Sequence, residues 1–349
     1  MIETSSKFFW LRLWLFALAA LVLAMVVVGG ATRLTHSGLT ITEWRPLVGI
    51  IPPLGEADWS ALFAKYRQIP EYQQLNSGMT LDQFKPMFWW EWSHRALARF
   101  VGLVAGLGLV FFLSVPDIRR RFWKPLVGIF ALGALEGFAG WYMVMSGLSD
   151  RTDVSQYRLT LHLGIATLIM GYTLWTVLGM GRDVQNPQSA GQEGSWARWL
   201  ALGLVASIYG QILLGGFVAG LDAGLSYNTW PLMDGRVIPH GLRAMSPAWV
   251  NPFENPVTVQ FDHRIGAYLV ATLALINHVL AWRSGNRRLL ASAAAVLTIV
   301  LLQIGLGIWT LLAVVPLHLA LAHQLAAMAV LATAIVHLHR TQQCHAADS

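Results

Sequence analysis

The sequence contains one cysteine and few charged residues. Because Cys344 is the only thiol in 349 residues, neither an internal disulfide nor a cysteine-based metal site can form within one chain. Charged residues make up 12% of the chain, about half the share of an ordinary soluble domain, and hydrophobic residues make up 55%. This composition excludes an ordinary soluble fold, and the net charge of +6 does not indicate nucleic-acid binding.

Apolar stretches of roughly 20 residues recur along the chain, each long enough to cross the ~30 Å core of a bilayer. They lack the short alternating segments of a membrane β-barrel. The first stretch follows Lys7 and Arg12 and has no small-x-small cleavage site, so we expect an uncleaved anchor. The sequence therefore predicts an all-α integral membrane protein with eight transmembrane helices, near residues 13–30, 95–114, 124–145, 159–179, 198–217, 264–282, 290–312 and 317–338.

Basic residues gather in the short connections between these spans. By the positive-inside rule these connections are cytoplasmic, together with both termini. The long loops 31–93 and 218–262 are then outside, and the first of them contains two candidate short helices, 56–67 and 79–92. The basic clusters that set this orientation are Arg119-Arg120-Arg121 with Lys124, Arg182 with Arg198, and Arg283 with Arg287-Arg288.

The two halves of the chain resemble each other. The segment from Gly29-Gly30 through Gly38-Leu39 to Trp44 matches Gly215-Gly216 through Gly224-Leu225 to Trp230 at a constant offset of 186 residues (215 − 29 and 230 − 44). Each half contains four predicted spans, and an even number makes the repeats parallel. We therefore predict two pseudo-symmetric four-helix bundles, residues 1–190 and 191–349.

Four of the eleven histidines recur in this repeat, near the outer ends of the even-numbered spans. His94 matches His263, and His162 matches His323. One membrane histidine is often only an interhelical hydrogen bond, but two ligands on different helices are how a bundle holds a cofactor in its core. Zinc usually takes three or four protein ligands, whereas two opposed imidazoles suit the axial positions of a haem iron. The pattern predicts two bis-histidine haem sites.

The other seven histidines are weaker candidates. His36 and His240 fall in outer loops and are expected to face solvent, and His318 is a second choice as a ligand. The functional roles of these three and of His278 stay open. The last three are expected to lie in a solvated tail: His337, His339 and His345.

An acid precedes the first histidine of one half, and an amide precedes that of the other. Glu91 stands three residues before His94, and Gln260 three residues before His263, so each shares a helix face with its histidine. A carboxylate beside a haem can move protons or stabilise developing positive charge, which an amide does poorly. The first half therefore predicts a reaction site, and the second an electron-relay or structural haem. The alternative for Glu91 is an interfacial acid paired with a base.

An arginine follows each of these histidines. Haem propionates are anionic, so Arg95 and Arg264 are candidates for charge-assisted hydrogen bonds to them. The alternative is an interfacial arginine that extends its charged end towards the headgroups.

These motifs, spread over essentially the whole chain, resemble the haem A synthase family. The chain lacks the outer-loop cysteine pair of many members and is similar to the cysteine-free branch of proteobacteria and mitochondria. The motifs that carry the resemblance are Gly29-Gly30-Ala31-Thr32-Arg33-Leu34-Thr35 with Ser37-Gly38-Leu39, Glu91-Trp92-Ser93-His94-Arg95, His162, Gly224-Leu225 with Asn228-Thr229-Trp230-Pro231, Asp262-His263-Arg264, and His323.

The resemblance implies an oxidoreductase that converts haem O to haem A by oxidising a porphyrin methyl group to a formyl group through an alcohol. It implies that His94 and His162 flank the substrate haem, with Glu91 as the catalytic acid. It also implies that His263 and His323 are the axial ligands of a permanent cofactor, haem b (iron protoporphyrin IX).

The same resemblance sets the expected surroundings. We expect haem O as substrate, a haem O synthase and the lipid bilayer as partners, an electron acceptor that the sequence does not identify, and no nucleic acid; a homo-oligomer stays open. The short N-terminus shows no transit peptide, which favours a bacterial inner membrane. Two other functions stay open, a dihaem b-type electron-transfer or quinol protein and a non-enzymatic haem carrier.

Overall fold

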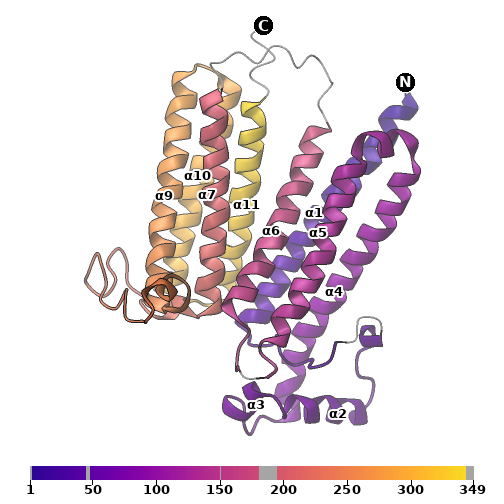
Figure 1. Ribbon diagram of the computed structural model, residues 1–349, viewed down its shortest axis with the longest axis vertical. Helices are drawn as coiled ribbons and strands as arrows, with labels where there is room; N and C mark the ends of the chain where they lie inside the picture. The colour runs from indigo at the N-terminus through magenta and orange to yellow at the C-terminus, as the bar shows by residue number, and fades with distance from the viewer. Residues whose placement is uncertain (1, 45–47, 150, 181–194, 343–349) are drawn as a thin grey trace. The chain divides into compact units, whose positions relative to one another are not determined.

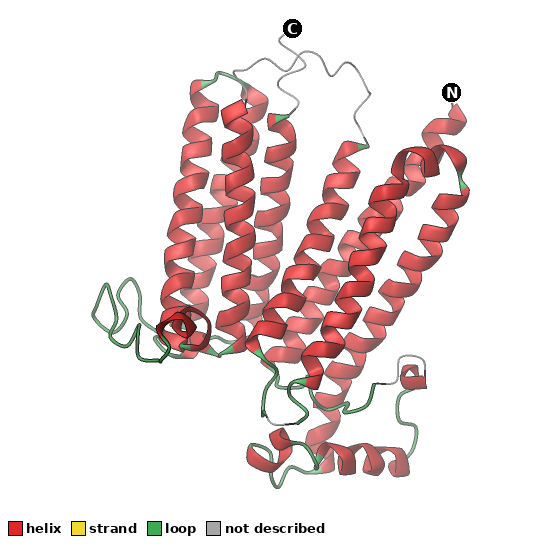
Figure 2. Ribbon diagram, viewed as in Figure 1, coloured by secondary structure: helices red, strands yellow, loops and turns green. Residues whose placement is uncertain are grey.

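The computed structural model describes residues 2–44, 48–149, 151–180 and 195–342. Over these residues the chain is helical apart from the connecting segments, with no β-strand (Figure 2). Eight of the described helices are long and apolar enough to cross a membrane, which confirms the prediction of an eight-span, all-α membrane protein. Cys344, Arg182, His345 and the predicted boundary at residues 190 and 191 lie outside the described residues.

The long helices divide between two compact units, one formed by Ala17–Ile169 and the other by Met1–Phe16 with Met170–Ser349. We describe each unit by itself. In chain order the long helices are α1 (Ile2–Leu34), α4 (Leu81–Ser114), α5 (Pro116–Met145), α6 (Gln156–Gly179), α7 (Ser195–Gly220), α9 (Pro256–Arg283), α10 (Arg287–Leu312) and α11 (Leu317–Thr341). Short helices and 3-10 turns join them: η1 (Val48–Ile50), α2 (Glu56–Tyr66), α3 (Pro70–Gln74), η3 (Ala223–Leu225), η4 (Ala248–Val250) and α8 (Asn251–Glu254).

Helix α4 is longer than the sequence suggested. A short helix over 79–92 and a separate span from residue 95 were expected, but a single helix runs from Leu81 to Ser114. Thr80 and Gln83 form a reciprocal capping box at its start, with the backbone N–H of Thr80 donating to Gln83 Oε1 over 2.9 Å. The start agrees with the expected one, and the expected break was wrong because nothing in 87–95 ends the helix. Glu91 and His94 therefore lie on one continuous helix.

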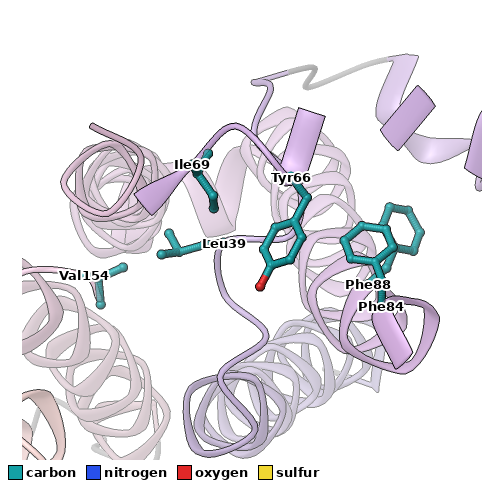
Figure 3. Close-up of a cluster of buried hydrophobic side chains, with 6 residues drawn as sticks. All are labelled: Leu39, Tyr66, Ile69, Phe84, Phe88 and Val154. Carbon is teal, nitrogen blue, oxygen red and sulfur yellow. The ribbon is translucent and has the colours of Figure 1, made fainter. Parts of the chain in front are cut away.

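The segment between α1 and α4 (residues 35–44 and 48–80), called the outer segment after its expected side of the membrane, packs over the beginning of α4. Figure 1 shows α2 and α3 lying across that end of the helix. Tyr66 is fully buried there, and its ring lies between Leu39 and Ile69 on one side and Phe84 and Phe88 on the other (Figure 3). The Tyr66 and Phe84 ring centres are 5.1 Å apart. This aromatic cluster fixes the outer segment on the end of α4 that carries the candidate site residues.

In the other unit, α7, α9, α10 and α11 form a four-helix bundle (Figure 1). Helix α7 packs against α9 and α11, and α10 packs against the same two helices. Because consecutive helices run in opposite directions, α9 and α11 begin at the same end of the bundle. His263 and His323 lie within the first two turns of these helices and are therefore brought to that end.

The backbone repeats the pattern of the sequence directly after α1 and α7. His36 has φ of 50° and Asp222 has φ of 48°, and these two positions are separated by the same 186 residues (222 − 36). A left-handed conformation is uncommon for residues other than glycine. Two such residues at equivalent positions support the same turn in both repeats.

The prediction of a solvated tail from residue 337 onwards was wrong for the described part. Helix α11 continues to Thr341, and the side chains of His337 and His339 are buried. His337 Nδ1 lies 3.0 Å from Ser292 Oγ, and its Nε2 lies 3.4 Å from Asn277 Oδ1. These partners on α10 and α9 give His337 the structural role of joining three helices of the bundle.

Candidate functional site: two pairs of histidines

Glu91 of α4 is a buried acid whose two carboxylate oxygens both accept hydrogen bonds. Its Oε2 accepts hydrogen bonds from Thr40 Oγ1 over 2.6 Å and from the backbone N–H of Ile41 over 2.7 Å. Its Oε1 accepts from Arg95 Nη2 over 2.6 Å, and the Glu91 side chain is 3% exposed. Three donors, one of them the charged guanidinium of Arg95, hold the carboxylate in one position. The pairing with a base that the sequence left open is therefore present.

Arg95 ties the segment after α1 to the same point. It donates to the backbone carbonyls of Ile41 over 2.7 Å and Glu43 over 3.1 Å as well as to Glu91. Glu91 and Arg95 together therefore bind both the N–H and the carbonyl of Ile41. This places the acid beneath the outer segment, one turn from His94.

The second half holds the equivalent backbone position with the equivalent side chains. Gln260 Nε2 and Arg264 Nη2 each donate to the carbonyl of Tyr227 over 3.1 Å. Tyr227 corresponds to Ile41 by the repeat offset of 186 (227 − 41). The exchange of acid for amide thus changes the direction of the contact, because Glu91 accepts from the loop whereas Gln260 donates to it.

Arg264 differs from Arg95 because two of its nitrogen donors have no hydrogen-bond partner among the described residues. Among the described residues, Nε and Nη1 of Arg264 are buried and have no hydrogen-bond partner. A buried guanidinium with two unused donors is suited to a planar anionic oxygen group. This agrees with the expectation of a propionate at Arg264, which stays a prediction, as it does at Arg95.

In the first unit each candidate histidine lies against a glycine of the neighbouring helix. A Cβ atom on Gly29 of α1 would lie 3.1 Å from Nε2 of His94, and one on Gly140 of α5 would lie 3.0 Å from Cε1 of His162. These distances are tighter than ordinary van der Waals contacts. The glycines therefore make room for the two imidazole rings.

The second unit repeats this arrangement. A Cβ atom on Gly215 of α7 would lie 3.3 Å from Cε1 of His263, and one on Gly307 of α10 would lie 2.7 Å from Cε1 of His323. The rings of His263 and His323 have centres 6.5 Å apart with an angle of 76° between their planes. Two imidazoles on one metal, with bonds of about 2 Å each, would have ring centres roughly 6 Å apart, so this pair fits an iron between two axial nitrogens.

An amide holds His263 from behind. Gln211 of α7 donates from Nε2 to the His263 carbonyl over 2.8 Å and lies 3.1 Å from its Nδ1. The same nitrogen lies 3.5 Å from Nε2 of the ring. Because an amide N–H only donates, Gln211 fixes the backbone and the ring position of His263 but does not accept a hydrogen bond from Nδ1–H, as the partner of a metal-bound histidine usually does. Gln211 could not be selected from the sequence, because it lies inside an apolar span.

Sequence reasoning also missed Glu136 of α5. Its Oε1 lies 3.1 Å from Nδ1 of His162. The equivalent residue of the second half is Gln303, since 303 − 136 equals the offset between Gly140 and Gly307 (307 − 140). Extending the repeat alignment into these spans would have revealed a second exchange of acid for amide.

The comparison with known proteins agrees with this architecture. Residues 12–335 match the sequence profile of the family described as cytochrome oxidase assembly protein. The chain belongs to this family. It is 52% identical over 334 residues to the heme A synthase of Chelativorans sp. (strain BNC1), covering 95% of this chain and 91% of that protein. It is 53% identical over 329 residues to the heme A synthase of Rhizobium etli (strain CIAT 652), covering 94% and 88%.

A third relative extends the same result. The heme A synthase of Parvibaculum lavamentivorans is 50% identical over 328 residues, with 94% of this chain and 93% of that protein covered. The family resemblance inferred from the motifs is therefore confirmed. The matched range 12–335 extends over both halves and contains the positions of all four candidate histidines.

The remaining histidines do not join either candidate pair. His36, His240 and His318 are exposed, and His278 is half-buried on α9. Within the described ranges no group of three or more histidine, cysteine, aspartate or glutamate side chains is arranged to hold a metal ion.

Proposed function

We propose that this chain is a haem A synthase, which oxidises the methyl group of haem O to a formyl group through an alcohol. One observation supports the proposal most directly: the two halves have similar histidine pairs, but an acid stands beside the pair in one half and an amide in the other. Glu91 lies one turn from His94 beneath the outer segment, whereas Gln260 takes that position beside His263. The identity of about 50% with heme A synthases over nearly the whole chain supports the same function.

We assign the substrate to the first half. His94 and His162 bind the iron of haem O, and Glu91 is the catalytic acid. His263 and His323 bind haem b, and their 6.5 Å separation supports this assignment. When bound, haem b supplies a one-electron redox centre. In this proposal residues 1–190 form the reaction half and residues 191–349 the cofactor half.

The reaction is an oxidation with water as the oxygen source. Conversion of the methyl group to the alcohol adds one water molecule and releases two electrons and two protons. Conversion of the alcohol to the aldehyde releases two more of each, and an external acceptor takes all four electrons. Glu91 accepts a proton or stabilises positive charge at the methyl carbon, and its contacts with Arg95 and Thr40 hold it in place for this task.

The surroundings follow from the same assignment. We place the chain in a bacterial inner membrane, with both termini cytoplasmic and both histidine pairs towards the outer face. Arg95 and Arg264 are then close to the side from which haem propionates would point. A haem O synthase supplies the substrate, and association of the chain with itself is open.

Analysis of the bound haems tests the proposal. The chain is purified after expression with a supply of haem O, and its pigments are extracted and identified by mass. We expect haem A and haem b from the wild type. Glu91→Gln should retain haem but accumulate haem O or the alcohol. The exposed acid on the same helix, Asp82, gives the control D82N, which should produce haem A normally.

Each other result has a defined meaning. Normal haem A from Glu91→Gln would refute the role of Glu91. A wild-type protein that holds only haem b would favour the dihaem electron-transfer protein. Wild-type protein that holds unaltered haem O would favour the haem carrier.

A further inference from the structure

Glu136 and His162 are paired across two neighbouring helices of one unit. Glu136 Oε1 of α5 lies 3.1 Å from His162 Nδ1 of α6, and the two side chains are 18% and 20% exposed. The second oxygen, Oε2, is buried and has no hydrogen-bond partner among the described residues. A buried carboxylate directed at one nitrogen of an imidazole leaves the other nitrogen, Nε2, for a metal.

The second half lacks this carboxylate. Gln303 occupies the equivalent position and donates from Nε2 to the backbone carbonyl of His323 over 2.9 Å. Nδ1 of His323 and Nδ1 of His162 are both buried, and neither makes a hydrogen bond of ordinary geometry in the described part of the chain. Only Nδ1 of His162 has a carboxylate oxygen within ion-pair distance. Glu136 and Gln303 therefore lie at equivalent positions and each contacts the histidine of the next helix. Only Glu136 places an anion beside the imidazole ring.

We propose that Glu136 is a positioning residue that accepts a hydrogen bond from Nδ1 of His162 and lowers the reduction potential of the haem held in the first half. This inference rests on the proposed function, since it takes His162 as an axial ligand of the substrate haem. A carboxylate behind a histidine ligand fixes the ring and its tautomer and makes the imidazole a stronger donor. The same negative charge favours the more positive, oxidised iron.

Both effects act in the direction that the reaction needs. Oxidation of the haem O methyl group removes electrons from the substrate haem, and a lower potential makes their removal easier. The second half keeps its haem throughout the reaction and has an amide at this position. Both positions that carry an acid only in the first half then have a role there. Glu91 acts at the reacting carbon, and Glu136 acts on the iron through His162.

The test measures the midpoint potential of the first-half haem in the purified holoprotein. Because haem O, the alcohol and haem A differ in potential, all variants are made in the Glu91→Gln background, and only preparations that hold the same haem by mass are compared. We expect Glu136→Gln to raise the potential of the first haem, to leave that of the second unchanged, and to weaken binding of the first haem by about 10–100-fold. The matched control Gln303→Leu should leave the first potential unchanged.

The remaining outcomes separate this inference from the proposed function. A first haem that is present in Glu136→Gln with an unchanged potential overturns the inference alone. If replacing His162 leaves the haem content at the wild-type level, the proposed function is overturned instead. If Glu136→Gln loses both haems, Glu136→Asp decides, because its shorter side chain withdraws the oxygen from Nδ1. A raised potential in that variant supports the inference, and an unchanged one overturns it.

Discussion

The carboxylate of Glu91 lies 2.6 Å from the guanidinium group of Arg95, one turn further along α4. Both side chains are largely buried, at 3% and 14% exposure, and both also bind the backbone of Ile41. The pair therefore holds the segment after α1 against α4. An acid fixed in this way keeps its position while the outer segment covers it.

Replacing Arg95 should destabilise the protein more than replacing its counterpart Arg264. Arg95→Gln removes the charged partner of a buried carboxylate, a change that typically costs about 3–5 kcal/mol. Arg264→Gln removes one described hydrogen bond from a charged donor, to Tyr227, which is worth about 1.5–3 kcal/mol. Thermal unfolding of the two variants in detergent measures the difference. Equal losses would show that the ion pair with Glu91 adds nothing to stability.

Gly307→Ala should displace His323 and reduce haem binding in the second half. The new Cβ atom would lie 2.7 Å from Cε1 of His323, so the ring has to move away from its position opposite His263. Gly305 lies on the same helix, and a Cβ atom there would meet nothing within 4 Å. We expect Gly305→Ala to keep the wild-type haem content and Gly307→Ala to lose the second haem. Haem absorbance per chain gives the answer, and full occupancy in Gly307→Ala would contradict the assigned ligand.

The eight spans were predictable because each depends on a local pattern. Long apolar runs determine the spans, and the Gly29 and Gly215 motifs align the two halves without any structure. The left-handed backbone at His36 and Asp222 agrees with that alignment. The start of α4 at Leu81 agrees with the helix expected from residue 79, but the break expected before residue 95 was wrong, because the polar residues Glu91, His94 and Arg95 interrupt the apolar run without ending the helix.

The surroundings of the site could not be predicted, because they join residues that are distant in the sequence. Thr40 and Ile41 reach Glu91 only after the outer segment has folded back over α4. Gln211 and Glu136 lie inside apolar spans, where a polar residue can serve either packing or function. Only the contacts of Glu136 with His162 and of Gln211 with His263 distinguish these roles.

A second buried acid, Glu71 of α3, should make the stability of the protein depend on pH. Burial raises the pKa of the Glu71 carboxyl from its ordinary value of 4.5 to about 8, with further increases from the carboxylates of Asp153 and Glu91 and an opposing effect of Arg33. Its side chain is 4% exposed, and Oε2 has no hydrogen-bond partner among the described residues. Between pH 4.5 and 8 the folded protein therefore holds a proton that the unfolded chain releases.

This difference fixes the sign of the effect. Since the folded state binds more protons in this window, the free energy of unfolding falls as pH rises from 4.5 to about 8 and then levels off. Glu71→Gln removes the contribution, so the variant should match the wild type near pH 5 and exceed it by roughly 2–4 kcal/mol at pH 9. Thermal unfolding across this range measures both curves, with Glu56→Gln, an exposed acid of α2, as the control that keeps the wild-type profile. Parallel curves for Glu71→Gln and the wild type would mean that Glu71 is ionised in the folded protein at neutral pH.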